Sequence, residues 1–162
     1  MQLLISDANI FIDLEEGKLI KLLFQLPYKF SLPDILFIEE LEIEHQYLIG
    51  LGLLLRILES KTMTYAMELI PRYTKASRND CFALALAIQE ECSLLTGDKA
   101  LREAANSEGV VVMGTLWIIE QLIRQNLITV AQARAAYTRM KNAGRRLPWL
   151  LAERELQEIE NR

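Results

Sequence analysis

Short apolar runs alternate with longer helical patterns along most of this chain. The clearest runs are Gln2–Ser6, Tyr28–Leu32, Ser93–Thr96 and Val110–Met113. Runs that are apolar on both faces are typical of parallel strands, and the last of them is predicted to be fully buried. Leu53–Leu58 is predicted to be either a third strand or a buried helical turn. The alternation predicts an α/β fold of three layers, α/β/α, with a central parallel sheet of about five strands.

Proline and capping residues mark the starts of several predicted helices. A helix is expected from Pro33 to about Leu48, because proline suits the first helical turn. Ser77 or Asn79 can cap a later helix that contains Asp80 in its first turn. These helices would supply the layers that cover the sheet.

The end of the chain predicts helices only. Thr129-Val-Ala-Gln132 has the spacing of a capping box, and Gly144 and Pro148 separate two helical stretches. We therefore expect a sheet domain over residues 1–125 and a helical appendage over residues 126–162, packed on that domain or on a partner.

Composition and charge limit the partners of the protein. The chain has 162 residues and a formal net charge of −4, so it offers no general attraction to a polyanion. A nucleic acid would have to be held by a local patch or through metal ions. The stretch Arg134–Arg146 contains five basic residues and no acidic one. It is interpreted either as a solvated helix face or as a patch that contacts phosphates or an acidic partner.

Cysteines and apolar runs indicate the compartment. Cys81 and Cys92 fall on one predicted helix, too far apart for a disulfide, and are interpreted as packing residues of a reduced protein. The chain opens without the pattern of a signal peptide and contains no apolar run long enough to cross a membrane. A cytoplasmic protein without a membrane partner is expected. His45, the only histidine, is expected at the surface or partly packed.

Three aspartates stand at one edge of the predicted sheet. Asp7 follows the first strand, Asp98 follows the strand Ser93–Thr96, and Asp80 opens the preceding helix. A helix packed on a parallel sheet runs opposite to its strands, so helix starts and strand ends share one level. Each aspartate alone could be a helix cap or a turn residue. Together they predict an acidic site where open α/β sheets bind ligands.

A cluster of carboxylates indicates a particular chemistry. Neighbouring carboxylates repel one another, and a shared cation relieves the repulsion. Oxygen ligands favour Mg²⁺ or Mn²⁺, with substrate phosphate completing the coordination. Such a site best serves phosphodiester hydrolysis, which requires no histidine base.

At these residues the chain resembles the PIN-domain family, metal-dependent ribonucleases that include the VapC-like toxins of toxin-antitoxin pairs. The resemblance covers about Met1 to Thr115. It rests on Asp7-Ala-Asn9, on Pro33 followed by Glu40-Leu41, on the Asp80 helix and on Thr96-Gly-Asp98-Lys99. The chain from Gly114 to Pro148 is similar to a branch of the family with extra C-terminal helices.

The resemblance implies a set of site residues. Asp7, Glu40, Asp80 and Asp98 would hold Mg²⁺ or Mn²⁺, and Asn9 and Thr96 would support them by hydrogen bonds. Glu39 is the alternative to Glu40, because helical periodicity does not separate the two. Asp13 is expected to be a solvated helix residue.

The implied function is that of a divalent-metal endoribonuclease, set as the toxin of a type II pair with a protein antitoxin. The alternative is a non-catalytic module that binds RNA or protein. An aspartyl-phosphate phosphatase would need a second aspartate two residues after Asp7, where the chain has Asn9. A homodimer is expected, because the apolar runs Leu51–Leu55 and Trp149–Leu151 exceed what one small domain covers and PIN-like proteins commonly pair.

Overall fold

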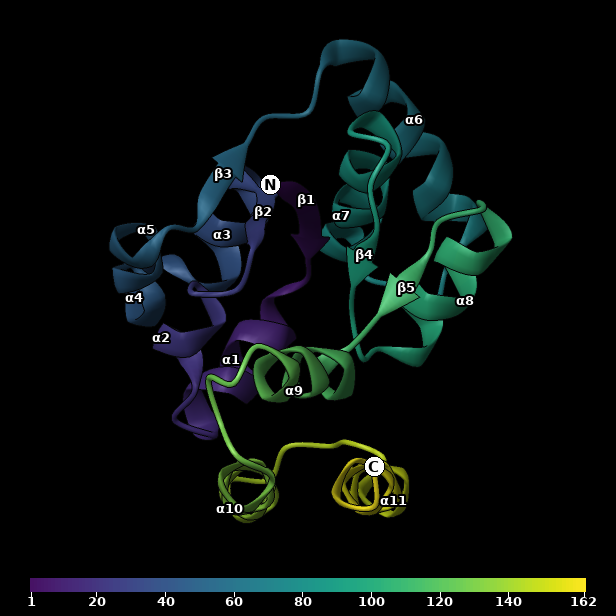
Figure 1. Ribbon diagram of the computed structural model, residues 1–162. Helices are drawn as coiled ribbons and strands as arrows, with labels where there is room; N and C mark the ends of the chain where they lie inside the picture. The colour runs from purple at the N-terminus through teal and green to yellow at the C-terminus, as the bar shows by residue number, and fades with distance from the viewer.

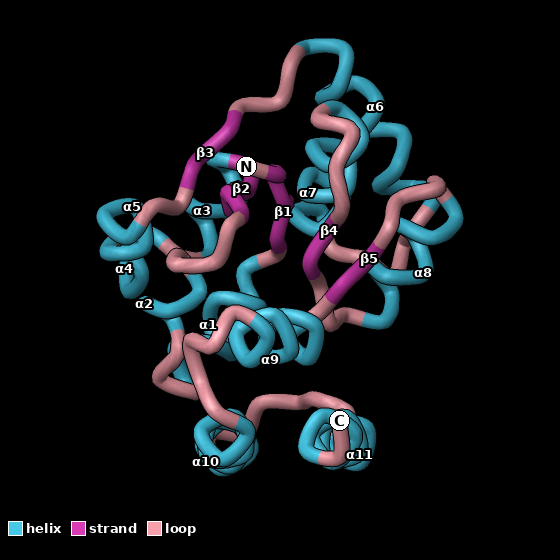
Figure 2. Tube along the Cα trace, in the orientation of Figure 1, coloured by secondary structure: helices cyan, strands magenta, loops and turns pink.

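Five parallel strands form the centre of the molecule. The computed structural model describes residues 1–162. The strands are β1 (Gln2–Ser6), β2 (Tyr28–Pro33), β3 (Leu54–Arg56), β4 (Leu94–Leu95) and β5 (Val112–Met113). They are hydrogen-bonded in the order β3-β2-β1-β4-β5, and every pair is parallel (Figure 2). This confirms the predicted α/β/α fold and identifies the Leu53–Leu58 segment as a strand.

Helices cover both faces of this sheet. On one face lie α1 (Ala8–Glu16), α2 (Ile20–Leu23) and α9 (Thr115–Arg124). On the other lie α7 (Arg78–Gln89) and α8 (Lys99–Ser107), with α6 (Ser60–Arg72) packed on α7 (Figure 1). From β1 the chain crosses to β2 on one side of it and then to β3 at that edge of the sheet. From β3 it returns past β1 to β4 on the other side. Right-handed crossovers therefore place α1 and α7 on opposite faces.

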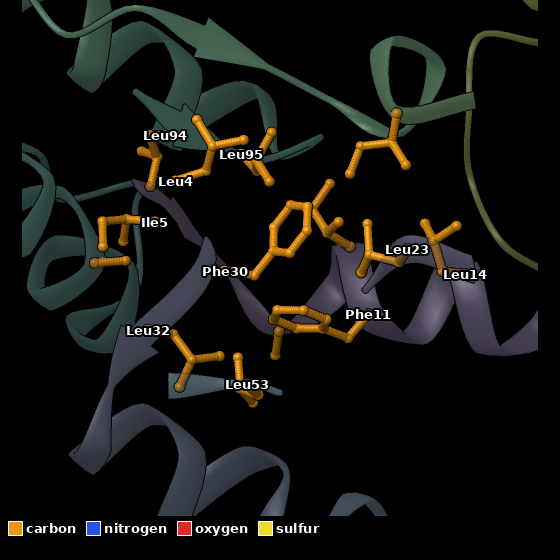
Figure 3. Close-up of a cluster of buried hydrophobic side chains, with 14 of the residues drawn as sticks. Leu4, Ile5, Phe11, Leu14, Leu23, Phe30, Leu32, Leu53, Leu94 and Leu95 are labelled. Carbon is orange, nitrogen blue, oxygen red and sulfur yellow. The ribbon is translucent and has the colours of Figure 1, made fainter. Parts of the chain in front are cut away.

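The core lies between the sheet and these helices. Figure 3 shows Phe11 of α1 beside Phe30 of β2, with Leu14 farther along α1 and with Leu4 of β1 and Leu95 of β4 close to each other. All five side chains are at most 1% exposed. Burial on this scale fixes where β1 and β4 end, and so fixes the edge at which the aspartates stand.

The helix expected from Pro33 to about Leu48 is interrupted. It consists of α3 (Asp34–Glu40), α4 (Glu42–His45) and α5 (Tyr47–Leu51). The first break falls at Leu41, whose backbone leaves the helical region at φ −124° while its side chain is 1% exposed. The chain thus turns where Leu41 enters the core. Gly52, at φ 127°, ends α5 in a conformation that suits glycine.

Two other expectations were wrong. Val110–Met113 is not fully buried, since Val111 is 64% exposed and β5 is an edge strand with β4 as its only neighbour. Cys92 lies beyond the end of α7 rather than on the helix of Cys81, and both thiols are free. No helix is long and apolar enough to cross a membrane.

The last two helices are α10 (Val130–Asn142) and α11 (Trp149–Glu160). Both capping-box bonds predicted at Thr129 and Gln132 are present. Figure 1 shows the pair beyond α1 and α9, with α10 packed on both of those helices. Gly17 permits the close approach, because a Cβ there would lie 2.6 Å from Cε of Met140. Residues of α10 and α11 are part of the same buried core as the sheet.

Candidate active site at the carboxyl edge of the sheet

Asp7 occupies the step from β1 into α1. Its backbone N–H donates to the carbonyl oxygen of Leu95 at 3.0 Å, which aligns it with the end of β4. Its carboxylate caps α1, where Oδ1 accepts from the N–H of Ile10 at 3.2 Å. The other oxygen accepts from the hydroxyl of Thr96. Asp7 is 2% exposed, and no basic side chain contacts it.

This environment makes the charge of Asp7 costly. Burial raises the pKa of the Asp7 carboxyl from 3.8 to about 7, and the nearby charges of Asp80 and Asp13 act in the same direction. The hydrogen bonds from Thr96 and Ile10 oppose this rise without cancelling it. A buried carboxyl with so high a pKa is a common mark of a functional site.

Thr96 joins Asp7 to the turn that contains Asp98. Its hydroxyl oxygen also accepts from the backbone N–H of Asp98 at 3.0 Å. Asp98 in turn caps α8, where Oδ2 accepts from the N–H of Leu101 at 2.8 Å. A single hydroxyl therefore ties the ends of β1 and β4 together and holds Asp98 beside Asp7.

Asp80 stands in the first turn of α7 and forms a capping box with Ser77. The N–H of Ser77 donates to Oδ2 of Asp80 at 3.3 Å, and the N–H of Asp80 donates to the hydroxyl of Ser77 at 3.0 Å. Burial raises the pKa of Asp80, and the charge of Asp98 adds to the rise. Ser77 is thus the cap, of the two residues proposed from the sequence.

Glu39 and Glu40 are tied to the same helix start by one amide. Nδ2 of Asn79 donates to an oxygen of each glutamate at 2.9 Å. Glu39 also pairs with Arg78 at 3.4 Å. Glu40 has no cationic partner, and burial followed by the charges of Asp80 and Glu39 raises its pKa. Oδ1 of Asn79 is buried beside these carboxylates without a hydrogen-bond partner.

These acidic groups face one edge, but they do not form a ready-made metal cage. No group of three or more histidine, cysteine, aspartate or glutamate side chains lies close enough to hold an ion. The physical reason lies in the caps. Asp80 and Asp98 direct a carboxylate oxygen at backbone N–H groups of their own helix starts, which separates mutually repelling charges.

Asp13 was expected in solvent, and this expectation was wrong. It is 5% exposed, and its Oδ2 accepts from the hydroxyl of Thr115 at 2.8 Å. Its Oδ1 pairs with Nε of Arg145 at 2.7 Å, while Nη2 of Arg145 donates to Oδ1 of Asn9 at 3.0 Å. Asn9 thus contacts the C-terminal segment rather than the carboxylates. Asp13 follows Asn9 by four residues, about one helical turn, so the two side chains share a face of α1, but this spacing does not reveal the contact with Arg145.

Most of the basic stretch has partners inside the molecule. Arg134 pairs with Glu153 at 2.8 Å and with Glu160 at 2.7 Å. Arg139 donates to the carbonyl oxygen of Gly17, and Arg145 pairs with Asp13. The description as a solvated face therefore fits only Lys141 and Arg146 of the five basic residues.

His45 is more buried than expected. It is 7% exposed, and its Nε2 lies 3.3 Å from Oε1 of Glu15, which places it between α1 and α4. Tyr47 donates a hydrogen bond to the same glutamate. The histidine belongs to this contact between helices and not to the acidic edge.

Comparison with known protein families agrees with the fold. The family model of the PIN domain matches residues 3–161, which includes both α10 and α11. No curated protein matches the chain.

Proposed function

Because the chain belongs to the PIN-domain family, whose members are generally nucleases, we propose that it is a divalent-metal-dependent endoribonuclease. The observation that carries the proposal is the state of Asp7. It is a buried carboxyl with a pKa raised to about 7, it faces other acids, and the chain supplies no cation for it. A cation from outside would relieve that cost.

The donors at this edge are oxygens, the ligand type that Mg²⁺ and Mn²⁺ prefer, although no three of these carboxylates lie close enough in this structure to hold an ion. In this proposal Asp7, Glu40, Asp80 and Asp98 hold the ion, and Thr96 supports them. Asp80 and Asp98 each use only Oδ2 in their caps, so Oδ1 of each is free. When bound, the ion supplies positive charge that offsets charge on the phosphate and eases deprotonation of water.

Each protein group has its own part in this proposal. Thr96 orients the Asp7 carboxylate by donating to one of its oxygens, and Asn79 orients Glu40 by donating to Oε2. Glu40 is preferred to Glu39 because Glu39 already pairs with Arg78. Asn9 supports the site only indirectly in this proposal: it holds Arg145 at 3.0 Å beside Asp13 and does not contact the four carboxylates.

The test is cleavage of a single-stranded RNA oligonucleotide by the purified protein in Mn²⁺ or Mg²⁺. EDTA should abolish cleavage, and Asp7→Asn and Glu40→Gln should lower the rate by about 100-fold or more. Glu39→Gln is the matched control and should keep most of the rate. Cleavage that survives both chelation and Asp7→Asn would reject the proposal, and no cleavage under any condition would favour a non-catalytic module.

We further propose that the protein is the toxin of a type II pair and that a protein antitoxin binds it. Support comes only from the PIN-domain resemblance to VapC-like toxins. Expression in bacterial cells should arrest growth, and Asp7→Asn should remove the arrest. Co-expression of the adjacent gene should also relieve it. Growth unaffected by the wild-type protein would reject the toxin role while leaving the nuclease proposal to the cleavage assay.

A homodimer is the last part of the proposal. Exposed apolar side chains gather around α4, α5 and β3, where Ile43 is 96%, Ile57 75% and Leu54 39% exposed. Soluble monomers rarely expose a large apolar patch. In the apolar run Trp149–Leu151, Leu150 is 86% exposed, while Trp149 packs on Tyr137. Light scattering should give twice the chain mass, and Ile57→Glu should give the monomer.

A further inference from the structure

Two clefts beside the acidic edge share one wall. The first, of about 510 Å³, lies between Asn9, the start of α8 and the segment 144–147. The second, of about 550 Å³, lies between Thr96, the end of β5 and the start of α11. Gly97, Arg146 and Leu147 line both. The two clefts therefore form one groove that passes Thr96 and Asp98.

The shared wall is a fixed part of the fold. Gly144 ends α10 at φ 83°, and the N–H of Arg145 donates to the carbonyl oxygen of Met140 at 3.0 Å. The side chain of Arg145 then turns inward to Asp13 and Asn9. This anchors the segment against α1, so Arg146 is held where it lines both clefts.

The groove carries unpaired positive charge. Lys99, Arg102 and Arg146 are exposed and make no ion pair or side-chain hydrogen bond. Asp13 and Arg145 neutralise each other, so the remaining acids in the groove are Asp98 and Glu155. This local excess of positive charge contrasts with the net charge of −4 for the whole chain. It is the kind of patch that a phosphate requires.

The second cleft adds an apolar wall. Met113, Leu116, Leu147 and Leu151 line it, and Leu151 is 42% exposed. An unstacked base presents flat faces that pack against aromatic or apolar side chains. We propose that this groove binds the RNA strand beside the cleavage site, with Lys99 and Arg146 on a phosphate and Leu147 and Leu151 against a base. The inference rests on the proposed ribonuclease function.

The experiment measures binding of fluorescein-labelled oligouridylate by fluorescence anisotropy. EDTA is present, because it removes the divalent metal and so prevents the proposed cleavage. Lys99→Ala and Arg146→Ala should each raise Kd about fivefold and reduce the salt slope by about 0.7, the value for one phosphate contact on a single strand. Lys141→Ala and Arg154→Ala are matched controls, because both residues are exposed, unpaired and outside the groove. Leu151→Ser should weaken binding without changing the salt slope.

The outcomes separate this inference from the proposed function. If Lys99→Ala and Arg146→Ala bind no more weakly than the controls, the groove is rejected even where the wild type cleaves RNA. If they weaken binding while the wild type never cleaves RNA with metal, the groove stands and the nuclease proposal fails. A wild type that does not bind the oligonucleotide at all rejects the groove. Equal melting temperatures of wild type and variants show that the fold is kept.

Discussion

Two buried aspartates belong to α1, and only one of them has a positively charged partner. Asp13, within the helix, pairs with Arg145 at 2.7 Å and accepts a hydrogen bond from Thr115 at 2.8 Å. Asp7, the N-cap of the helix, accepts hydrogen bonds only from neutral donors, Ile10 and Thr96. The chain supplies a cation for one carboxylate and none for the other. Burial of an uncompensated carboxylate is destabilising, and carboxyls in this state are common at functional sites.

The difference between Asp7 and Asp13 should have its largest effect on the stability of the metal-free protein. Because the folded pKa of Asp7 is about 7 and the ordinary value is 3.8, the folded protein holds a proton that the unfolded chain releases. Stability from this group is complete below pH 3.8 and is lost as pH rises to about 7. The full loss of unfolding free energy is about 4 kcal/mol. Asp7→Asn has no carboxyl to ionise, so its stability does not fall in this way.

The measurement is urea unfolding in EDTA at pH 5 and pH 8. Asp7→Asn should exceed the wild type in free energy of unfolding at pH 8, and the advantage should shrink at pH 5. Asparagine remains a good cap, so the start of α1 is kept. A variant less stable than wild type at both pH values would show that Asp7 serves the fold.

The partner of Asp13 gives the next largest effect. Arg145→Met keeps most of the side-chain volume but leaves a buried carboxylate without its cation, which should cost about 3 kcal/mol of unfolding free energy. Adding Asp13→Asn to Arg145→Met should recover most of the loss, because no unpaired charge remains. Urea unfolding of the two single variants and the double variant measures the coupling. A loss under about 1 kcal/mol for Arg145→Met would show that Arg145 does not compensate the charge of Asp13, and Asp13 would then not differ from Asp7.

Local patterns predicted much of this molecule. The ends of β1, the helix cap that was expected at Ser77 or Asn79 and the capping box at Thr129 all depend on residues within a few positions of one another. The order of strand, aspartate and helix then placed Asp7, Asp80 and Asp98 at one edge, because a parallel sheet leaves few other arrangements.

Features that depend on distant residues were not predictable in this way. Asp13 was misjudged because its partner Arg145 is 132 residues away, and no periodicity of α1 reveals that contact. The run Val110–Met113 looked buried because an apolar run does not tell an edge strand from a central one. The direction of each carboxylate depends on competition between caps and repulsion, which spacing alone does not resolve.

A bound metal ion should give Asp7 the positive charge that Arg145 already gives Asp13. If Mg²⁺ or Mn²⁺ binds the folded protein at Asp7, it stabilises by about 2.7 kcal/mol at a concentration of 100 Kd. The gain should grow with the logarithm of metal concentration, and it should vanish in Asp7→Asn but persist in Arg145→Met. Melting curves at neutral pH, read as shifts relative to EDTA, measure this. Equal shifts in Asp7→Asn and wild type would place the metal elsewhere.

Asp98 should show the smallest effect without metal. It caps α8 through Oδ2, and asparagine caps about as well as aspartate, so Asp98→Asn should change the metal-free unfolding free energy by no more than about 0.5 kcal/mol. The substitution also removes one charge that raises the pKa of Asp80. With metal, however, the loss of a carboxylate ligand should visibly reduce the gain in melting temperature. Melting curves of Asp98→Asn with and without metal decide the matter. A variant that is markedly less stable without metal but keeps the full metal response would place Asp98 with Asp13, as a carboxylate that serves the fold.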